Sequence, residues 1–184
     1  MIVLVRHAEA VAPSDPHHEE NDRPLTDAGR RDAERLAGAL AAEAADAIYS
    51  SPYPRAVQTV EPFARRVGTE ISLVDDLRER LLSPGALPDW REHLQRAWTD
   101  FGYALEGGES SAEGQRRVTE VLGMLQGRHI GSRIVVASHG NLIALALHAI
   151  VPDQVGFELW AAMPTPAVYL LPGDGTVSGP GLGD

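Results

Sequence analysis

Two histidines and two arginines stand where phosphoryl chemistry could use them, each shortly after an apolar run of the sequence. Arg6 and His7 follow the first run, Arg55 follows the second, and His139 follows a later one. Guanidinium groups bind phosphoryl oxygens through paired N–H donors. A neutral imidazole, with a reference pKa of about 6.5, is a competent nucleophile near pH 7. Together these side chains predict a site that transfers a phosphoryl group.

The surroundings of two of these residues also indicate an anionic ligand. Arg55 lies in the first turn of a predicted helix, where a cation opposes the helix dipole. His139 precedes Gly140 and a strongly apolar segment, and the amide groups that open a buried helix favour phosphate. Each residue alone has an ordinary structural explanation, whereas the four together indicate one anion site.

The apolar pattern predicts alternating strands and helices that would bring these residues together. Thr26 caps a predicted helix, Ser110 to Glu113 form a capping box before another, and residues 142–150 form a buried one. The pattern indicates a single α/β domain, residues 1–184, with a mostly parallel central sheet, helices on both faces and a loose tail at 172–184. Ligands of such sheets bind beyond the carboxyl ends of the strands. Strands are predicted at residues 2–6, 47–49, 71–74, 134–137 and 167–171.

Composition narrows the classes of function. The 184-residue chain has no Cys and no Lys, since all sixteen basic residues are Arg, which excludes disulfides, a cysteine nucleophile and a Schiff-base lysine. Its net charge of -10 argues against nucleic acid and anionic membranes as partners. No apolar run approaches the roughly 20 residues that span a bilayer, and the start does not read as a signal peptide. A cytoplasmic protein is expected.

Five segments of the sequence together resemble the histidine phosphatase superfamily, whose fold is that of the phosphoglycerate mutase-like proteins. They occur in the family's order and span nearly the whole chain. The segments are Leu4-Val5-Arg6-His7-Ala8-Glu9, Pro24-Leu25-Thr26-Asp27-Ala28-Gly29, Ser51-Pro52-Tyr53-Pro54-Arg55-Ala56-Val57-Gln58-Thr59, Gly107-Gly108-Glu109-Ser110 and Val136-Ala137-Ser138-His139-Gly140.

The resemblance implies a role for each candidate residue. His7 would be the nucleophile that forms a phosphohistidine, while Arg6, Arg55 and His139 would hold the phosphoryl group. The family needs no metal and no organic cofactor. It uses an acid soon after the third strand, which here is Glu79, first as proton donor and then as general base. Glu109 is the rival, although it precedes a capping serine and could simply orient that loop.

Two segments depart from the family pattern or are specific to this chain. The loop from Pro13 to Asn21 lacks the Trp-Asn pair typical of mutases, and Asn21 is a weak substitute for the missing amide. Its adjacent His17 and His18 are typical of solvated residues more than of a metal site. The helix from Trp90 to Phe101 lies where the family inserts a cap, and packing on the sheet explains it equally well.

These features favour a metal-independent phosphomonoesterase acting on a small phosphorylated metabolite. The alternatives are phosphoglycerate mutase-type transfer, a protein phosphohistidine phosphatase and a non-catalytic module that binds a phosphorylated ligand. A metal-dependent hydrolase is the weakest of the alternatives. A homodimer is expected only because symmetric dimers are the commonest assemblies.

Overall fold

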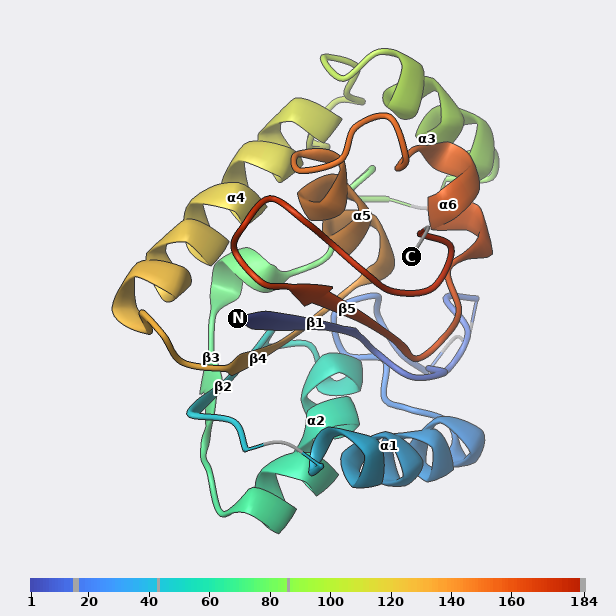
Figure 1. The fold of residues 1–184 in the computed structure, drawn as a ribbon. Coiled ribbons are helices and arrows are strands. Elements are labelled where there is room, and N and C mark those ends of the chain that lie inside the picture. The colour runs from blue at the N-terminus through green and yellow to red at the C-terminus, as the bar shows by residue number, and fades with distance from the viewer. Residues whose placement is uncertain (15–16, 43, 86, 183–184) are drawn as a thin grey trace.

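A computed structural model describes residues 1–14, 17–42, 44–85 and 87–182. Its five strands form one sheet in the order β3-β2-β4-β1-β5 (Figure 1). The pairs β1–β4, β2–β4 and β2–β3 are parallel, whereas β5 runs antiparallel to β1. The predicted α/β fold with a mostly parallel sheet is confirmed. The strands are β1 (Ile2–Arg6), β2 (Ala47–Ser50), β3 (Ile71–Leu73), β4 (Ile134–Ser138) and β5 (Ala167–Leu171).

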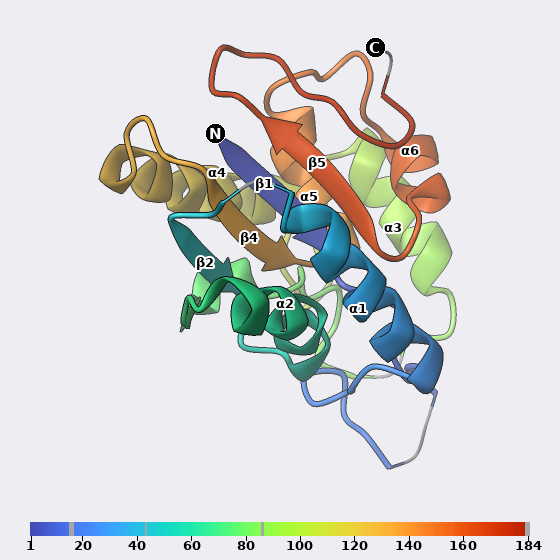
Figure 2. The ribbon, with the colours of Figure 1, turned by 60° about the horizontal axis from the view of Figure 1, so that its bottom comes forward.

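Helices cover both faces of the sheet, as predicted. One face carries α1 (Asp27–Leu40) and α2 (Pro54–Val67), and the other carries α4 (Ser111–Arg128) and α5 (Gly140–His148) (Figures 1 and 2). Two further helices, α3 (Trp90–Thr99) and α6 (Phe157–Ala162), contact each other, and α6 also contacts α5. The helical layers therefore bury the sheet on both sides.

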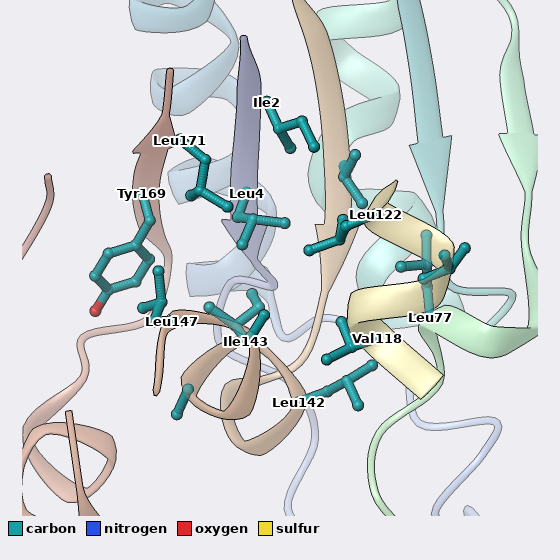
Figure 3. Close-up of a cluster of buried hydrophobic side chains, with 14 of the residues drawn as sticks. Ile2, Leu4, Leu77, Val118, Leu122, Leu142, Ile143, Leu147, Tyr169 and Leu171 are labelled. Atoms are coloured by element: carbon teal, nitrogen blue, oxygen red, sulfur yellow. The ribbon is translucent and has the colours of Figure 1, made fainter. Parts of the chain in front are cut away.

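Side chains of β1 alternate between two hydrophobic clusters. Ile2 and Leu4 of β1 belong to the cluster under α4 and α5 (Figure 3), whereas Val3 and Val5 belong to the one under α1 and α2. Successive side chains of a strand point to opposite faces, so a strand covered on both sides is apolar throughout. This explains why the residues preceding Arg6 form an unbroken apolar run.

The ends of the helices follow local sequence signals. The Thr26 hydroxyl accepts a hydrogen bond from the Gly29 amide at 3.0 Å and so caps α1. Ser110 and Glu113 form the predicted capping box at the start of α4. The apolar segment that begins at Leu142 lies in α5, whose residues 140–147 are all buried. Within the described ranges, no helix is both long enough and apolar enough to cross a membrane.

Four parts of the chain differ from the predicted elements. The short helix α6 and a single 3-10 turn at Asp75–Leu77 were not predicted, and the helix that starts at Trp90 ends at Thr99, before Phe101. The segment expected to be a loose tail folds back along β5, where the backbones of Leu170 and Ser178 exchange hydrogen bonds of 2.9 and 3.1 Å. Its apolar side chains at 177 and 182 pack against the core, and residues 183–184 of that segment lie outside the described residues.

Candidate active site

The sheet order brings the three predicted strand ends to one edge. Strands β2, β4 and β1 are consecutive and parallel, so their carboxyl ends lie side by side. The His7 amide bonds to the Ser138 carbonyl at 3.1 Å, and the Ser51 amide bonds to the Ala137 carbonyl at 2.9 Å, so each first residue after the strand stays in register. Side chains far apart in sequence therefore meet beyond this edge.

His7 has one ring nitrogen engaged and the other available. Its Nδ1 lies 2.7 Å from the Ala8 carbonyl oxygen. A carbonyl can only accept, so Nδ1 carries the ring proton and Nε2 keeps its lone pair. Burial, followed by the positive charge of Arg55, lowers the pKa of His7 to about 3, and Arg6 and Arg23 act in the same direction. At neutral pH the side chain is an uncharged imidazole among three cations.

His139 faces His7 from the start of α5. The ring centroids are 5.3 Å apart, and the His139 side chain is fully buried. Its Nε2 lies 2.8 Å from the Ser51 hydroxyl, which also accepts a 3.3 Å hydrogen bond from the Tyr53 amide, so the hydroxyl proton can be donated to Nε2. Burial, with a further contribution from Arg55, lowers the pKa of His139 well below its ordinary value. Its Nδ1 is buried and has no partner in the described chain.

In this structure the anionic partner of Arg55 is the side chain of Glu20. Arg55 is 1% exposed, and its guanidinium donates to the Glu20 backbone carbonyl at 2.5 Å and to the Glu20 carboxylate at 2.7 Å. The buried Arg23 forms two further 2.8 Å bonds to the same carboxylate. An acidic side chain thus places its two oxygens on two guanidinium groups, as a bound anion would.

Arg6 lies across the start of α5. Its Nη1 donates to the backbone carbonyls of Met163 and Pro164, and its Nε is buried with no partner among the described residues. A Cβ atom on Gly140 would lie 2.9 Å from the Arg6 guanidinium carbon. The absence of a side chain at Gly140 therefore lets Arg6 approach the first turn of α5.

Glu79 is held by backbone amides at the same helix start. Its carboxylate accepts hydrogen bonds from the amides of Arg80, Asn141 and Leu142 at 2.9, 3.1 and 3.0 Å. Burial lowers the pKa of Arg6 and of Arg55, and the negative charge of Glu79 partly offsets this lowering in both.

The rival acid is engaged elsewhere. Both carboxylate oxygens of Glu109 accept hydrogen bonds from Arg117, at 2.8 and 2.6 Å. This ion pair fixes the loop before α4, which was the alternative reading of Glu109. Of these two carboxylates, Glu79 is the one whose charge raises the pKa of Arg6 and Arg55.

A cavity of about 310 Å³ opens beside Glu20 and Glu79, and its lining does not include Arg6, His7, Arg55 or His139. Trp90 and Leu94 line it, so the segment from Trp90 contributes to its wall, and Glu20 and Glu79 line it too. Three of its lining residues, Arg80, Asn141 and Trp160, were not singled out from the sequence. A volume of this size is at the small end of ligand sites.

The structure shows where several side chains of the loop from Pro13 to Asn21 lie. Asn21 is exposed, whereas Glu20 carries the contacts to the arginines. His18 lies 3.7 Å from Asp22, and among the described residues no three His, Asp or Glu side chains are grouped to hold a metal ion. Residues 15 and 16 of this loop lie outside the described part of the chain.

The sequence could have indicated Thr59 as a residue that positions the site. Its hydroxyl accepts from the Ala8 amide at 2.9 Å and donates to the Arg55 carbonyl at 2.6 Å, which joins α2 to the segment after His7. It lies four residues after Arg55, on the same face of the helix. Arg23 has no comparable signal, because it lies in a polar loop without periodicity.

Comparisons with known proteins agree with this architecture. The family model described as histidine phosphatase superfamily (branch 1) matches residues 2–171. Phosphoglycerate mutase-like protein 4 of Arabidopsis thaliana is 34% identical over 154 residues, 77% of this chain and 67% of the relative. Phosphoserine phosphatase 1 of Hydrogenobacter thermophilus is 31% identical over 148 residues, 75% and 70% of the two chains.

Solved structures show the same fold. YhfR of Bacillus stearothermophilus superposes with a TM-score of 0.75 at 26% identity, covering 97% of this chain and 94% of that one. A mycobacterial glucosyl-3-phosphoglycerate phosphatase gives a TM-score of 0.74 at 22% identity, covering 91% and 87% of the two chains.

Proposed function

This chain belongs to the histidine phosphatase superfamily, branch 1, and from that premise we propose that it is a metal-independent phosphomonoesterase working through a phosphohistidine on His7. The observation that carries the proposal is the state of the His7 ring. Its Nδ1 proton is bonded to a carbonyl, its Nε2 lone pair is available, and arginine charges surround it. A neutral nucleophile next to cations suits attack on an anionic phosphoryl group.

In the first step, His7 Nε2 attacks phosphorus while the bond from phosphorus to the ester oxygen breaks. The electron pair of that bond stays on the alcohol oxygen, which takes a proton from Glu79. Arg6, Arg55 and His139 hold the non-bridging oxygens, with His139 donating from Nδ1. These donors stabilise the charge of the transferring group, a task that bound metal ions perform in other phosphoryl-transfer enzymes.

In the second step, water releases the phosphoryl group from His7. Glu79, now a carboxylate, takes a proton from the water as its oxygen attacks phosphorus. The bond from nitrogen to phosphorus breaks, its electron pair returns to His7 Nε2, and inorganic phosphate leaves. Glu79 then carries the proton needed for the next cycle, so the two steps balance.

The cavity supports a small phosphorylated metabolite as substrate. It is about 310 Å³ in volume, and Glu20 and Glu79 border it. Two curated relatives carry different names, a phosphoserine phosphatase and a mutase-like protein. Hydrolysis is proposed here because the loop that contains Glu20 differs from the mutase pattern. A cytoplasmic location and a homodimer belong to the same proposal.

The test compares the wild type with His7→Ala on a generic aryl phosphate in excess chelator. We expect clear wild-type activity and a loss of about a thousandfold or more in the variant. His129→Ala is the matched control, because that histidine bonds to Tyr49 away from the site. An alkaline quench with labelled substrate should trap a phosphorylated wild-type chain and none in His7→Ala.

The other outcomes identify the alternatives. Activity that survives His7→Ala, or that chelator abolishes, contradicts the mechanism. A folded wild type that binds phosphate without turnover indicates a binding module. Transfer of the phosphoryl group to phosphoglycerate faster than to water indicates a mutase, and hydrolysis restricted to phosphohistidine peptides indicates the protein phosphohistidine phosphatase.

A further inference from the structure

The cavity beside Glu79 has a wall made of two tryptophans. Trp90 of α3 and Trp160 of α6 meet edge to face, with ring centroids 6.1 Å apart and an interplanar angle of 83°. Trp160 is also 5.5 Å from Phe157, and the Arg91 guanidinium lies 5.4 Å from the centre of the Phe157 ring. Trp160 therefore contacts both Trp90 and Phe157, and the two tryptophans present aromatic surface to the cavity.

This aromatic surface is only partly covered in the free protein. Trp90 is 45% exposed. Leu81, Leu82 and Leu94 line the same cavity, and Pro13 borders it as well. Covering such a surface with an apolar group removes it from water, which favours binding. The cavity offers this gain to the part of a substrate that extends beyond Glu79.

Arg80 and Asn141 also line the cavity, and each has one buried N–H donor without a partner in the described chain. Arg80 Nε donates to Asn141 Oδ1 at 2.9 Å, and Arg80 Nη1 bonds to the Glu109 carbonyl and the Ser111 hydroxyl, each at 3.2 Å. Arg80 Nη2 and Asn141 Nδ2 remain buried with no partner in the described chain. A buried donor left without an acceptor costs free energy, so an oxygen atom supplied by a ligand would bind there.

These donors lie close to the proposed proton donor. The backbone amide of Asn141 donates to the Glu79 carboxylate at 3.1 Å, and Arg80 follows Glu79 in sequence. An oxygen that reached both donors would therefore sit near the ester oxygen of the substrate. A second phosphate group in the cavity would have to compete with Glu20 for Arg23.

We propose that this cavity selects the alcohol part of the substrate, and that the preferred alcohol combines a flat apolar body with an oxygen atom next to the ester. The apolar body packs on Trp90 and Trp160, and the oxygen accepts from Arg80 and Asn141. This inference rests on the proposed phosphatase function, because it names the class of phosphomonoester that the same site hydrolyses.

The test uses three monoesters of primary alcohols, so that intrinsic reactivity changes little. Ethyl phosphate has no apolar body, 2-phenylethyl phosphate adds a ring, and 2-hydroxy-2-phenylethyl phosphate adds an oxygen. We expect kcat/KM to rise about tenfold or more from the first to the second, mostly through KM, and a further severalfold for the third. Equal values for ethyl and 2-phenylethyl phosphate overturn the proposal, and equal values for the second and third overturn the assignment of the oxygen.

A double variant, Trp90→Ala with Trp160→Ala, tests the location of the preference. The ratio of kcat/KM for 2-phenylethyl phosphate over ethyl phosphate should fall toward one. Arg80→Lys should reduce the added preference for the hydroxylated ester. Met124→Ala is the control, because Met124 is a similarly exposed apolar residue on α4 and should leave both ratios unchanged. A ratio that persists in the folded double variant places the preference elsewhere and contradicts the proposal.

The two proposals fail in different ways. If His7-dependent turnover occurs but the three esters react alike, the phosphatase function stands and the selectivity is wrong. If a folded wild type hydrolyses none of the three esters or the generic aryl phosphate, the proposed function itself is wrong.

Discussion

At the scale of single residues, the site is notable for a carboxylate that already occupies its arginines. Glu20 bonds to Arg55 and Arg23, yet its own side chain is half exposed. A half-exposed carboxylate can return to water, whereas the buried guanidinium groups need an acceptor in either state. A phosphoryl oxygen that binds Arg55 Nη2 would have to displace the Glu20 carboxylate, and we expect this competition to weaken phosphate binding.

Glu20→Gln is expected to tighten product inhibition. The neutral amide competes less well for two guanidinium groups, so the inhibition constant of inorganic phosphate should fall by about threefold to tenfold. Steady-state inhibition assays measure this constant, and Glu19→Gln, a change at the neighbouring exposed residue, is the control. A weaker inhibition by phosphate in Glu20→Gln would show that Glu20 supports the anion site instead of competing for it.

The sequence predicted the residues at strand ends well and the loop residues poorly. Arg6, His7, Arg55 and His139 follow apolar runs whose parallel packing alone brings them to one edge. The positions of Arg23 and Glu20 depend on a polar loop, whose path has no repeating pattern. Glu79 was placed by family resemblance, and only the structure shows that the amides opening α5 hold it.

At the scale of elements, the first turn of α5 organises the site. It supplies amides to Glu79, follows His139 directly and lies under the Arg6 guanidinium. The absence of a side chain at Gly140 is what allows Arg6 this position.

Gly140→Ala should therefore reduce activity with little loss of stability. The new methyl group would meet the end of a flexible side chain, so Arg6 can move away and the helix can remain intact. Loss of one charge-assisted contact to the phosphoryl group should lower kcat/KM by about tenfold or more. Kinetics and thermal melts measure both effects. The control is Gly123→Ala, where an added Cβ meets no atom within 4 Å; equal activities in the two variants would contradict this role of Gly140.

Most of the predicted elements are buried, although β3 was predicted and none of its three residues is buried. All five strands match their predicted bounds to within one residue, and the predicted caps Thr26 and Ser110 begin α1 and α4. The six-residue α6 has no buried residue and so leaves no apolar periodicity to recognise. The direction of β5 and the return of the chain along it depend on pairing with distant segments.

At the scale of the whole molecule, folding keeps two histidines uncharged. The pKa of His7 is lowered to about 3 and that of His139 well below its ordinary value, burial being the main cause for both. An unfolded chain takes up protons on both rings below pH 6.5, its ordinary pKa, whereas the folded chain does not. The free energy of unfolding should fall as the pH drops from about 6.5 toward 3, and these groups contribute no pH dependence above that window.

The expected size is up to about 2 kcal/mol for each histidine between pH 7.5 and pH 5. Denaturant titrations at both pH values should show a smaller loss in His7→Gln with His139→Gln than in the wild type. His129→Gln serves as the control because that ring bonds to Tyr49 and lies outside the site. An identical pH dependence in the double variant and the wild type would mean that neither buried ring resists protonation.

The sheet order also sets a sequence of events during synthesis. Strand β1 is made first, but it pairs only with β4 and β5, which lie more than 120 residues later. The growing chain can pair β2 with β3 and pack α2 early, while β1 and the attached His7 have no partner strand. The edge that carries the proposed site can form only once β4 has emerged, so we expect a nascent chain to lack activity until most of it has been translated.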